Sequence, residues 1–259
     1  MISQSIINNV KEIAVKAGEE IMQIYGDESR FDIVQKSDLS PLTAADQAAN
    51  TVIIKNLEKL VASYPIISEE NKQISYRDRK NYSRFWLVDP LDGTKEFIKR
   101  NGEFTVNIAL IEDQKPIFGV VYVPVTQEIY WAAKGKGSWY SSAGTTRKLR
   151  TTNYSMNQPN IRVVCSRSHI NEETQKLIDQ LNDPIIVSQG SSLKFLIIAR
   201  GDAELYPRIG PTMEWDTAAA HIVLAEAGGA VTQYGADTPL LYNKENLLNP
   251  YFIASASQS

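Results

Sequence analysis

The stretch WLVDPLDGTKEF, residues 86–97, joins an apolar run to a cluster of charged and turn-forming residues. Residues 85–88 predict a short buried strand. The chain then places Asp89 and Asp92 three positions apart, followed by Gly93, Thr94 and Lys95. Taken alone, DPLDG also fits a turn, because Asp-Pro and Asp-Gly pairs are common in turns. Other parts of the sequence are therefore needed to distinguish a simple turn from a functional site at DPLDG.

Composition restricts the classes of protein that this chain can be. Its 259 residues are 43% hydrophobic and 22% charged, which is enough to bury one large core or two adjoining subdomains. The net charge of −3 excludes the global basic field that drives non-specific nucleic-acid binding. An anionic substrate must then be held locally, by metal ions or by a few placed cations.

Cysteine and histidine usage excludes two further kinds of site. The one cysteine, Cys165, excludes an internal disulfide, and His169 and His221 are too far apart in the sequence to suggest a zinc cluster. Charges interrupt every apolar run of residues 1–20, so we expect neither a signal peptide nor an integral membrane segment. These features fit a protein of the reducing cytoplasm.

The first hundred residues predict helices and a short strand. Apolar residues recur at three- and four-residue steps from residue 6 to 24, which predicts a helix that ends near Gly26. A second helix is expected to start near Thr43, and residues 34–43 between the helices are expected to form a turn or loop. Residues 64–68 predict a short strand that ends at Glu69 and Glu70.

The remaining residues predict sheets and helices in alternation. Residues 104–110 alternate with a period of two and, with strands near 117–125 and 128–133, predict an antiparallel meander. Strands are expected at 161–165 and 184–188, and helices from Ser192 to Arg200 and from Trp215 to Ala227. The fold class is therefore a layered α+β protein. Its expected halves, residues 1–150 and 151–259, form one compact unit.

Four carboxylates lie at ends of segments that belong in a core: Glu69, Asp89, Asp92 and Asp216. Glu69 also fits a solvated strand end, and Asp216 fits a helix N-cap. If the four converge, a cation must be present, because burying unpaired carboxylates costs several kcal/mol each. Oxygen ligands without His or Cys select Mg²⁺ or Mn²⁺ over zinc. Calcium is less favoured, because no D-x-D-x-D-G loop occurs.

A helix that starts near Thr94 would supply the second half of a site. The free N–H groups of Gly93 and Thr94 would form a phosphate cradle beside the metals, which suggests phosphoryl chemistry. Asp46 has two interpretations at this point. Residues 43–46 resemble a capping box with Asp in place of Glu, and a cap is the commoner role at this spacing.

The segments PLTAADQAAN, PIISEEN, WLVDPLDGTKEF and EWDTAAAHIVLAEAGG resemble, in order and spacing, the inositol monophosphatase-like phosphatases, which are Mg²⁺-dependent and lithium-sensitive. The resemblance covers roughly residues 5 to 255. DGTKEF, VVCSRSH and GSSLKFLIIARGDAELYPRIGPTMEWDTAAAH resemble the branch of CysQ-type 3′(2′),5′-bisphosphate nucleotidases. The resemblance implies an αβαβα sandwich of the inositol monophosphatase and sugar phosphatase type. It also implies removal of the 3′-phosphate of adenosine 3′,5′-bisphosphate in sulfate assimilation, with its sulfated analogue as a further substrate.

The same resemblance implies roles for the site residues. Glu69, Asp89 and the Leu91 carbonyl would bind a first metal that activates the attacking water. Asp89, Asp92 and Asp216 would bind a second metal that neutralises the phosphate and the leaving oxygen. Asp46 and Thr94 would orient the water, and Gly93 and Thr94 would hold the phosphoryl oxygens.

The implied reaction is direct in-line attack with two or three metal ions and no covalent enzyme intermediate. Mg²⁺ is the expected cofactor and Mn²⁺ a substitute, whereas Ca²⁺ and Li⁺ are expected to inhibit.

The second phosphate and the nucleoside require donors that an inositol monophosphate would not. The alternatives are helix caps for the serines, a solvated face for Lys194 and a surface ion pair for Arg208. Lys95 either pairs with Glu96 or Glu103 in solvent or adds to the field that attracts the substrate. The predicted donors are Ser166, His169, Ser191, Ser192, Lys194 and Arg208.

Two rival functions remain open. The first is an inositol phosphate or fructose 1,6-bisphosphate phosphatase that uses the same metal site. The second is a non-catalytic nucleotide sensor, which would lack a metal ligand, and none is missing. We expect a monomer or weak dimer in the cytoplasm. Some bacterial relatives are peripheral on the inner membrane, but no basic amphipathic helix is evident here.

Overall fold

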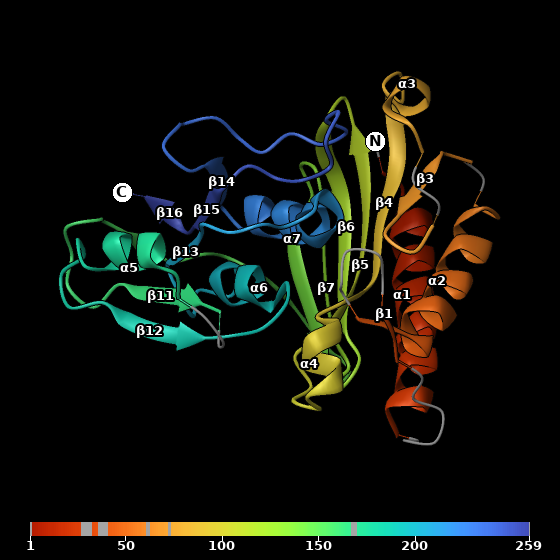
Figure 1. Ribbon diagram of the computed structural model, residues 1–259, viewed down its shortest axis with the longest axis horizontal. Coiled ribbons are helices and arrows are strands. Elements are labelled where there is room, and N and C mark those ends of the chain that lie inside the picture. The colour runs from red at the N-terminus through yellow and green to blue at the C-terminus, as the bar shows by residue number, and fades with distance from the viewer. Residues whose placement is uncertain are drawn as a thin grey trace.

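The computed structural model describes residues 2–26, 33–35, 41–60, 63–71, 74–166 and 170–258. Two helices, α1 Gln4–Gly26 and α2 Ala44–Leu57, form the outermost layer on one side (Figure 1). Both were predicted from the apolar period. Between them, β1 Ile33–Gln35 pairs with β2 Pro41–Thr43 in an antiparallel arrangement, where a turn or loop was expected. The loop prediction was therefore wrong for the residues that form β1 and β2, because strands of three residues are too short to give a periodic signal.

A seven-stranded sheet forms the second layer, in the order β3-β4-β5-β6-β7-β8-β9. β3 runs parallel to β4, and the later strands form the predicted antiparallel meander. The strands are β3 Ile66–Ser68, β4 Arg84–Asp92, β5 Thr105–Glu112, β6 Lys115–Val123, β7 Glu128–Ala133, β8 Gly137–Ser142 and β9 Thr145–Lys148.

Strand β4 is longer than its apolar run predicted. It continues through Asp89 to Asp92, and its register with β5 shifts between these two residues. Pro90 lies within this shift, where the missing N–H removes no regular ladder bond. The turn interpretation of DPLDG was therefore wrong, and the two aspartates lie at the irregular end of a central strand.

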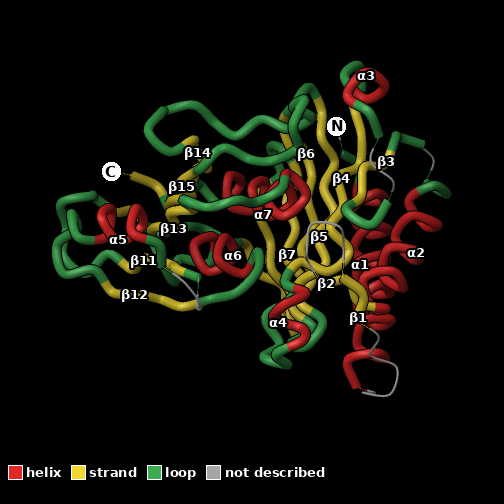
Figure 2. The backbone as a smooth tube through the Cα atoms, in the orientation of Figure 1, coloured by secondary structure: helices red, strands yellow, loops and turns green. Residues whose placement is uncertain are grey.

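Two helices separate the larger sheet from a second, five-stranded sheet (Figure 2). They are α6 Leu193–Ala199 and α7 Glu214–Glu226, close to their predicted bounds. The strands of the second sheet, in order, are β12 Ile185–Ser188, β11 Arg162–Cys165, β13 Leu205–Arg208, β15 Phe252–Ser255 and β14 Ala230–Gln233. The remaining elements are α3 Tyr76–Arg79, α4 Thr94–Ile98, α5 Glu172–Ile178 and the parallel pair β10 Asn153–Tyr154 and β16 Ser257–Gln258.

Helix α5 covers part of the outer face of the five-stranded sheet and completes the predicted αβαβα sandwich (Figure 1). Alternate residues of β4 enter different cores: Trp86 and Val88 pack with α1 and α2, whereas Phe85 and Leu87 pack with α6 and α7. This second core contains residues from both sides of position 150. The division of the chain at that position stays a prediction.

Helix α7 packs very closely on the larger sheet. A Cβ atom at Gly119 in β6 would lie 2.6 Å from the Ala219 carbonyl oxygen and 2.6 Å from Ile222 Cγ2. A side chain at position 119 therefore cannot be accommodated at this distance between the layers. No helix in the described ranges is long and apolar enough to cross a bilayer.

Candidate active site

A cavity of about 480 Å³ opens where β3, β4, α6 and α7 meet. It collects most of the residues that the sequence indicated. Asp46 is buried nearby but does not line the cavity, and His169 lies outside the described residues. The predicted residues in the cavity wall are Glu69, Asp89, Leu91, Asp92, Gly93, Thr94, Lys95, Ser166, Ser191, Ser192, Lys194, Arg208 and Asp216.

The fold brings four carboxylates together as one carboxylate cluster: Glu69, Asp89, Asp92 and Asp216. Because β3 and β4 are parallel neighbours with Ser68 opposite Val88, the next residue of each chain segment, Glu69 after β3 and Asp89 within β4, lies at the same level of the sheet. Asp216 comes from the first turn of α7. Glu69, Asp89 and Asp216 each offer one carboxylate oxygen, and these three oxygens lie within 4.8 Å of one another. Asp92 is not part of this closest group.

Burial and mutual repulsion raise the pKa values in this cluster. Burial raises the pKa of Asp89 well above its ordinary value, and the charges of Glu69, Asp92, Asp216 and Asp46 raise it further. Burial likewise raises the pKa of Asp216, helped by Asp92 and Glu69, while the Met213 N–H and Arg208 oppose the shift. A cation between these groups would oppose the upward pKa shifts and favour the ionised carboxylates.

The donor set of the cluster fits a hard divalent cation. Within the described residues, the cavity wall contains no histidine or cysteine and offers carboxylate oxygens together with the Leu91 carbonyl. Thr94 Oγ1 donates a long hydrogen bond of 3.3 Å to that carbonyl, and the Leu91 N–H donates to Asp89 Oδ1 at 3.1 Å. Oxygen-only sites of this kind bind Mg²⁺, Mn²⁺ or Ca²⁺ in preference to soft metals.

Asp216 is not the N-cap that its sequence position allowed. Met213 is the N-cap of α7, and Asp216 Oδ2 accepts a hydrogen bond of 2.9 Å from the Met213 N–H. This bond fixes one carboxylate oxygen of Asp216 against the start of its own helix. The rest of the carboxylate remains directed at the cavity that it lines.

Asp92 is held by the residues that precede α6. Its Oδ2 atom accepts hydrogen bonds from Ser191 Oγ at 2.6 Å, Ser192 N at 2.6 Å and Ser192 Oγ at 2.7 Å. Neither hydroxyl caps α6, because Ser192 is the N-cap residue but makes no side-chain cap bond. The capping alternative for these serines was therefore wrong.

Sequence reasoning missed two polar residues behind these serines. Asn107 Nδ2 donates to Ser192 Oγ at 3.0 Å, and Thr105 Oγ1 lies 2.9 Å from Ser191 Oγ. Both residues are fully buried in β5, where every neighbour on the strand up to Ile111 is also buried. A signal was available: Thr105 and Asn107 are two polar residues, two positions apart, in an otherwise apolar strand.

Gly93 meets two separate requirements at the start of α4. Its φ of 96° lies in the left-handed region that favours glycine, and a Cβ atom there would lie 3.0 Å from the Glu103 carbonyl oxygen. Helix α4 then begins at Thr94, as the sequence predicted. The role of its N–H groups in holding phosphate stays a prediction.

Lys194 and Arg208 form a cationic wall in the same cavity. Lys194 is only 7% exposed, and its Nζ donates to the Ser191 carbonyl at 2.6 Å, so the solvated-face alternative was wrong. Burial lowers the pKa of Lys194 to about 8, although Asp92 opposes the shift. Arg208 Nη2 donates to the Pro211 carbonyl at 2.7 Å, and within the described ranges no ion pair is found for it.

Ser166 and Lys95 lie at the margins of the cavity. Ser166 also lines a smaller neighbouring cavity of about 180 Å³ that reaches α5. Lys95 is exposed on the first turn of α4. Both of its proposed roles, as a solvent-exposed partner or as part of an attracting field, stay open.

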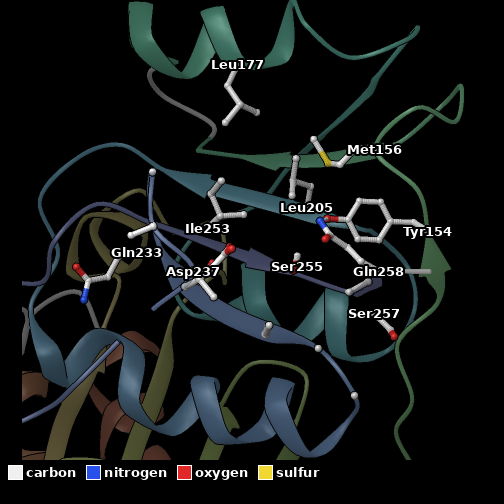
Figure 3. A pocket seen from close by; sticks show the side chains of 17 residues that line it. Tyr154, Met156, Leu177, Leu205, Gln233, Asp237, Ile253, Ser255, Ser257 and Gln258 are labelled. Carbon is white, nitrogen blue, oxygen red and sulfur yellow. Dashed lines mark hydrogen bonds between the residues drawn. The ribbon is translucent and has the colours of Figure 1, made fainter. Parts of the chain in front are cut away.

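A second large cavity, of about 530 Å³, lies on the outer face of the five-stranded sheet beside α5 (Figure 3). Leu205, Ile253 and Leu177 face it, and Gln258 Nε2 donates to Tyr154 Oη at 3.0 Å. Its described wall contains one carboxylate, Asp237, and no lysine or arginine. This cavity therefore does not fit an anionic substrate, and it contains none of the predicted site residues.

Comparison with known proteins gives one consistent result. The sequence profile of the inositol monophosphatase family matches residues 3–258. The chain is 48% identical over 251 residues to the 3′(2′),5′-bisphosphate nucleotidase CysQ of Escherichia coli K12, covering 96% of this chain and 99% of the relative. The corresponding Salmonella typhimurium protein is 46% identical over 247 residues, covering 95% and 98%.

Solved structures show the same fold. The crystal structure of CysQ from Bacteroides thetaiotaomicron, titled a bacterial member of the inositol monophosphatase family, superimposes with a TM-score of 0.85 at 41% identity. The superposition covers 97% of this chain and 98% of that one. The suhB protein of Bartonella henselae, at 23% identity and a TM-score of 0.81, covers 98% and 94% and shares the fold.

Proposed function

The chain belongs to the inositol monophosphatase family, and we propose that it is a Mg²⁺-dependent 3′(2′),5′-bisphosphate nucleotidase. Its substrate is adenosine 3′,5′-bisphosphate, which it converts to AMP and phosphate. The observation that carries this proposal is the pairing, in one cavity, of the carboxylate cluster with the buried cationic wall. The cluster suits a metal-assisted reaction at one phosphate, and the wall suits a second phosphate.

The cation-binding residues of this proposal are Glu69, Asp89, Asp92, Asp216 and the Leu91 carbonyl. Bound there, Mg²⁺ would polarise the phosphoryl group and lower the pKa of water. The chain's own contribution is to hold the carboxylates in place before the ion arrives. Asp89 accepts a hydrogen bond from the Leu91 N–H, Asp92 from Ser191 and Ser192, and Asp216 from the Met213 N–H.

Residues near Thr94 handle the water and the reacting phosphate. The N–H groups of Gly93 and Thr94, at the start of α4, hold the phosphoryl oxygens in this proposal. Thr94 Oγ1 orients the attacking water together with Asp46, which does not line the cavity but whose charge acts on Asp89. The bond from Thr94 Oγ1 to the Leu91 carbonyl is long, at 3.3 Å, so the hydroxyl can exchange this partner for water at little cost.

Lys194 and Arg208 bind the other phosphate. A phosphate near Lys194 Nζ would replace the missing solvent around this buried ammonium and restore its pKa upwards. Ser166 and His169 are further proposed donors to the second phosphate or the nucleoside. An inositol monophosphate has no second phosphate to meet the cationic wall, so it gains less from this cavity.

A substrate panel tests the proposal. Phosphate release is measured from adenosine 3′,5′-bisphosphate, its sulfated analogue, inositol 1-phosphate and fructose 1,6-bisphosphate, each with Mg²⁺ and with chelator. We expect the highest kcat/KM for adenosine 3′,5′-bisphosphate and no turnover in chelator. A preference for inositol 1-phosphate or fructose 1,6-bisphosphate would overturn the substrate assignment, and tight binding without turnover would indicate a sensor.

A further inference from the structure

Asn107 is buried beside the carboxylate cluster and has no role in the reaction described so far. It lies in β5 directly opposite Asp89 of β4, and its side chain is 1% exposed. Residues directly opposite each other in a sheet place their side chains on the same face. An amide buried in such a position costs free energy unless its hydrogen bonds are made. Asn107 therefore needs specific partners.

Its partners define a direction of donation. Asn107 Nδ2 donates to Ser192 Oγ at 3.0 Å, and Asn107 Oδ1 accepts from Thr105 Oγ1 at 3.2 Å. A hydroxyl has one proton to donate, and an amide NH₂ group can only donate. The proton of Ser192 Oγ is therefore directed away from Asn107 and towards other acceptors.

Two acceptor atoms lie within reach of that proton, and both belong to residues of the carboxylate cluster. Asp92 Oδ2 is 2.7 Å from Ser192 Oγ, and the Asp216 carbonyl oxygen is 2.8 Å away. Ser192 thus joins β4 to the first turn of α7. Ser191 Oγ and Ser192 N also donate to Asp92 Oδ2, so three donors lie within hydrogen-bond distance of this one oxygen.

We infer that Asn107 is a positioning residue for the cation site and acts through Ser192. By directing the Ser192 proton outwards, Asn107 keeps Asp92 Oδ2 bound to the start of α6. The other oxygen of Asp92 and the carboxylate of Asp216 are then held in a fixed relation for the cation. This inference rests on the proposed cation site and does not depend on which phosphate ester is the substrate.

A double-mutant cycle tests the inference by direct metal binding. Mn²⁺ affinity is measured by electron paramagnetic resonance, without substrate, for the wild type, Asn107→Ala, Ser192→Ala and the double variant. We expect each single change to weaken Mn²⁺ binding by about tenfold or more, as is usual for partners that orient metal ligands. The double variant should bind no more weakly than the weaker single variant, because both changes break the same connection.

Two outcomes would overturn the inference. Unchanged Mn²⁺ affinity in Asn107→Ala would show that the residue does not position the ligands, and losses that multiply in the double variant would show that it does not act through Ser192. Thermal unfolding in chelator checks that each variant folds. If Asn107→Ala does not fold, Asn107→Ser takes its place, because it keeps a polar group on β5 but is too short to reach Ser192.

Further measurements separate this inference from a purely structural role and from the proposed function. Ser192→Thr keeps the hydroxyl and should retain Mn²⁺ affinity within about threefold, whereas Ser192→Ala should not. Failure of the wild type to hydrolyse bisphosphates would overturn the proposed function and leave the Mn²⁺ cycle interpretable. A wild type that binds no Mn²⁺ would overturn both the cation site and the role of Asn107.

Discussion

The carboxylate cluster and the cationic wall face the same cavity, but their charges are stabilised in different ways. Asp89 and Asp216 are surrounded by further acids, so burial and repulsion act in the same direction on their pKa values. Lys194 is just as buried, yet its ammonium group donates to the Ser191 carbonyl and feels the opposite charge of Asp92. The negative charges of the carboxylate cluster therefore lack a compensating positive charge, whereas the ammonium group of Lys194 already has a hydrogen bond and an opposite charge within the protein.

Asp89→Asn should have the largest effect, because it removes the charge at the centre of the cluster. We expect kcat/KM to fall by about a thousandfold, at the upper end of what removing one charge-stabilising group costs. Steady-state phosphate release with saturating Mg²⁺ measures the loss. Asp113→Asn, an exposed change at a β-turn with positive φ, is the matched control and should be neutral. Wild-type activity in Asp89→Asn would remove Asp89 from the metal site.

Thr94→Ala separates orientation of water from binding of metal. We expect kcat to fall by about a hundredfold while the Mg²⁺ concentration for half-maximal activity changes little, because the hydroxyl is needed only to orient water. Thr94→Ser, which keeps the hydroxyl, should recover most of the rate. If Thr94→Ala instead weakens metal binding and leaves kcat intact, the hydroxyl supports the Leu91 carbonyl and not the water.

Lys194→Ala tests the cationic wall. We expect KM for adenosine 3′,5′-bisphosphate to rise by about tenfold or more and KM for a monophosphate to change little. Because the pKa of Lys194 is lowered to about 8, the wild-type KM for the bisphosphate should also rise as pH increases above 8. Lys95→Ala, at the exposed rim, is the comparison for a general field effect. Equal losses on both substrates would show that Lys194 does not bind the second phosphate.

The smallest expected effect is on the stability of the metal-free protein. The raised pKa of Asp89 means that the folded state binds its proton more tightly than the unfolded state, so ionisation destabilises the fold as pH rises. At pH 8 in chelator, Asp89→Asn should therefore melt a few degrees above the wild type. The difference should narrow as pH falls towards about 4, the ordinary range of carboxyl groups.

With added Mg²⁺ the wild type should melt above Asp89→Asn, since only the wild type gains the full binding free energy of the ion. Differential scanning fluorimetry over about pH 4 to 8, with chelator and with Mg²⁺, makes both measurements. A wild type that melts above Asp89→Asn in chelator at pH 8 would mean that the cluster is stabilised by the protein itself.

The two sides of the cavity also differ in how far the sequence could predict them. Glu69, Asp89 and Asp216 could be placed together because each lies at the end of a recognisable strand or helix. The meander and the helices followed from apolar periods in the same way. Asn107 and Thr105 could not be connected to Ser192 and Ser191, since their partners lie 85 and 86 residues away.

Other misses have local causes. Ser191 has a φ of 50°, a conformation that residues other than glycine adopt only where their surroundings impose it. For Lys194, predicted as a substrate donor, the solvated-face alternative stayed open in the sequence because a charge on a helix is usually exposed, but α6 lies between two sheets and all its residues are buried. Whether both faces of a helix are buried depends on how the layers of the fold pack together. The periodicity of apolar residues within one segment does not predict this packing.

The missing side chain at Gly119 sets how closely α7 can pack on β6. Because residue 119 has no side chain, α7 packs directly on the backbone of β6. Asp216 lies in the first turn of that helix. A methyl group at position 119 would clash with Ala219 and Ile222 and would force α7 away from β6. A contact that involves none of the four carboxylates therefore sets the distance between the helix that carries Asp216 and the larger sheet.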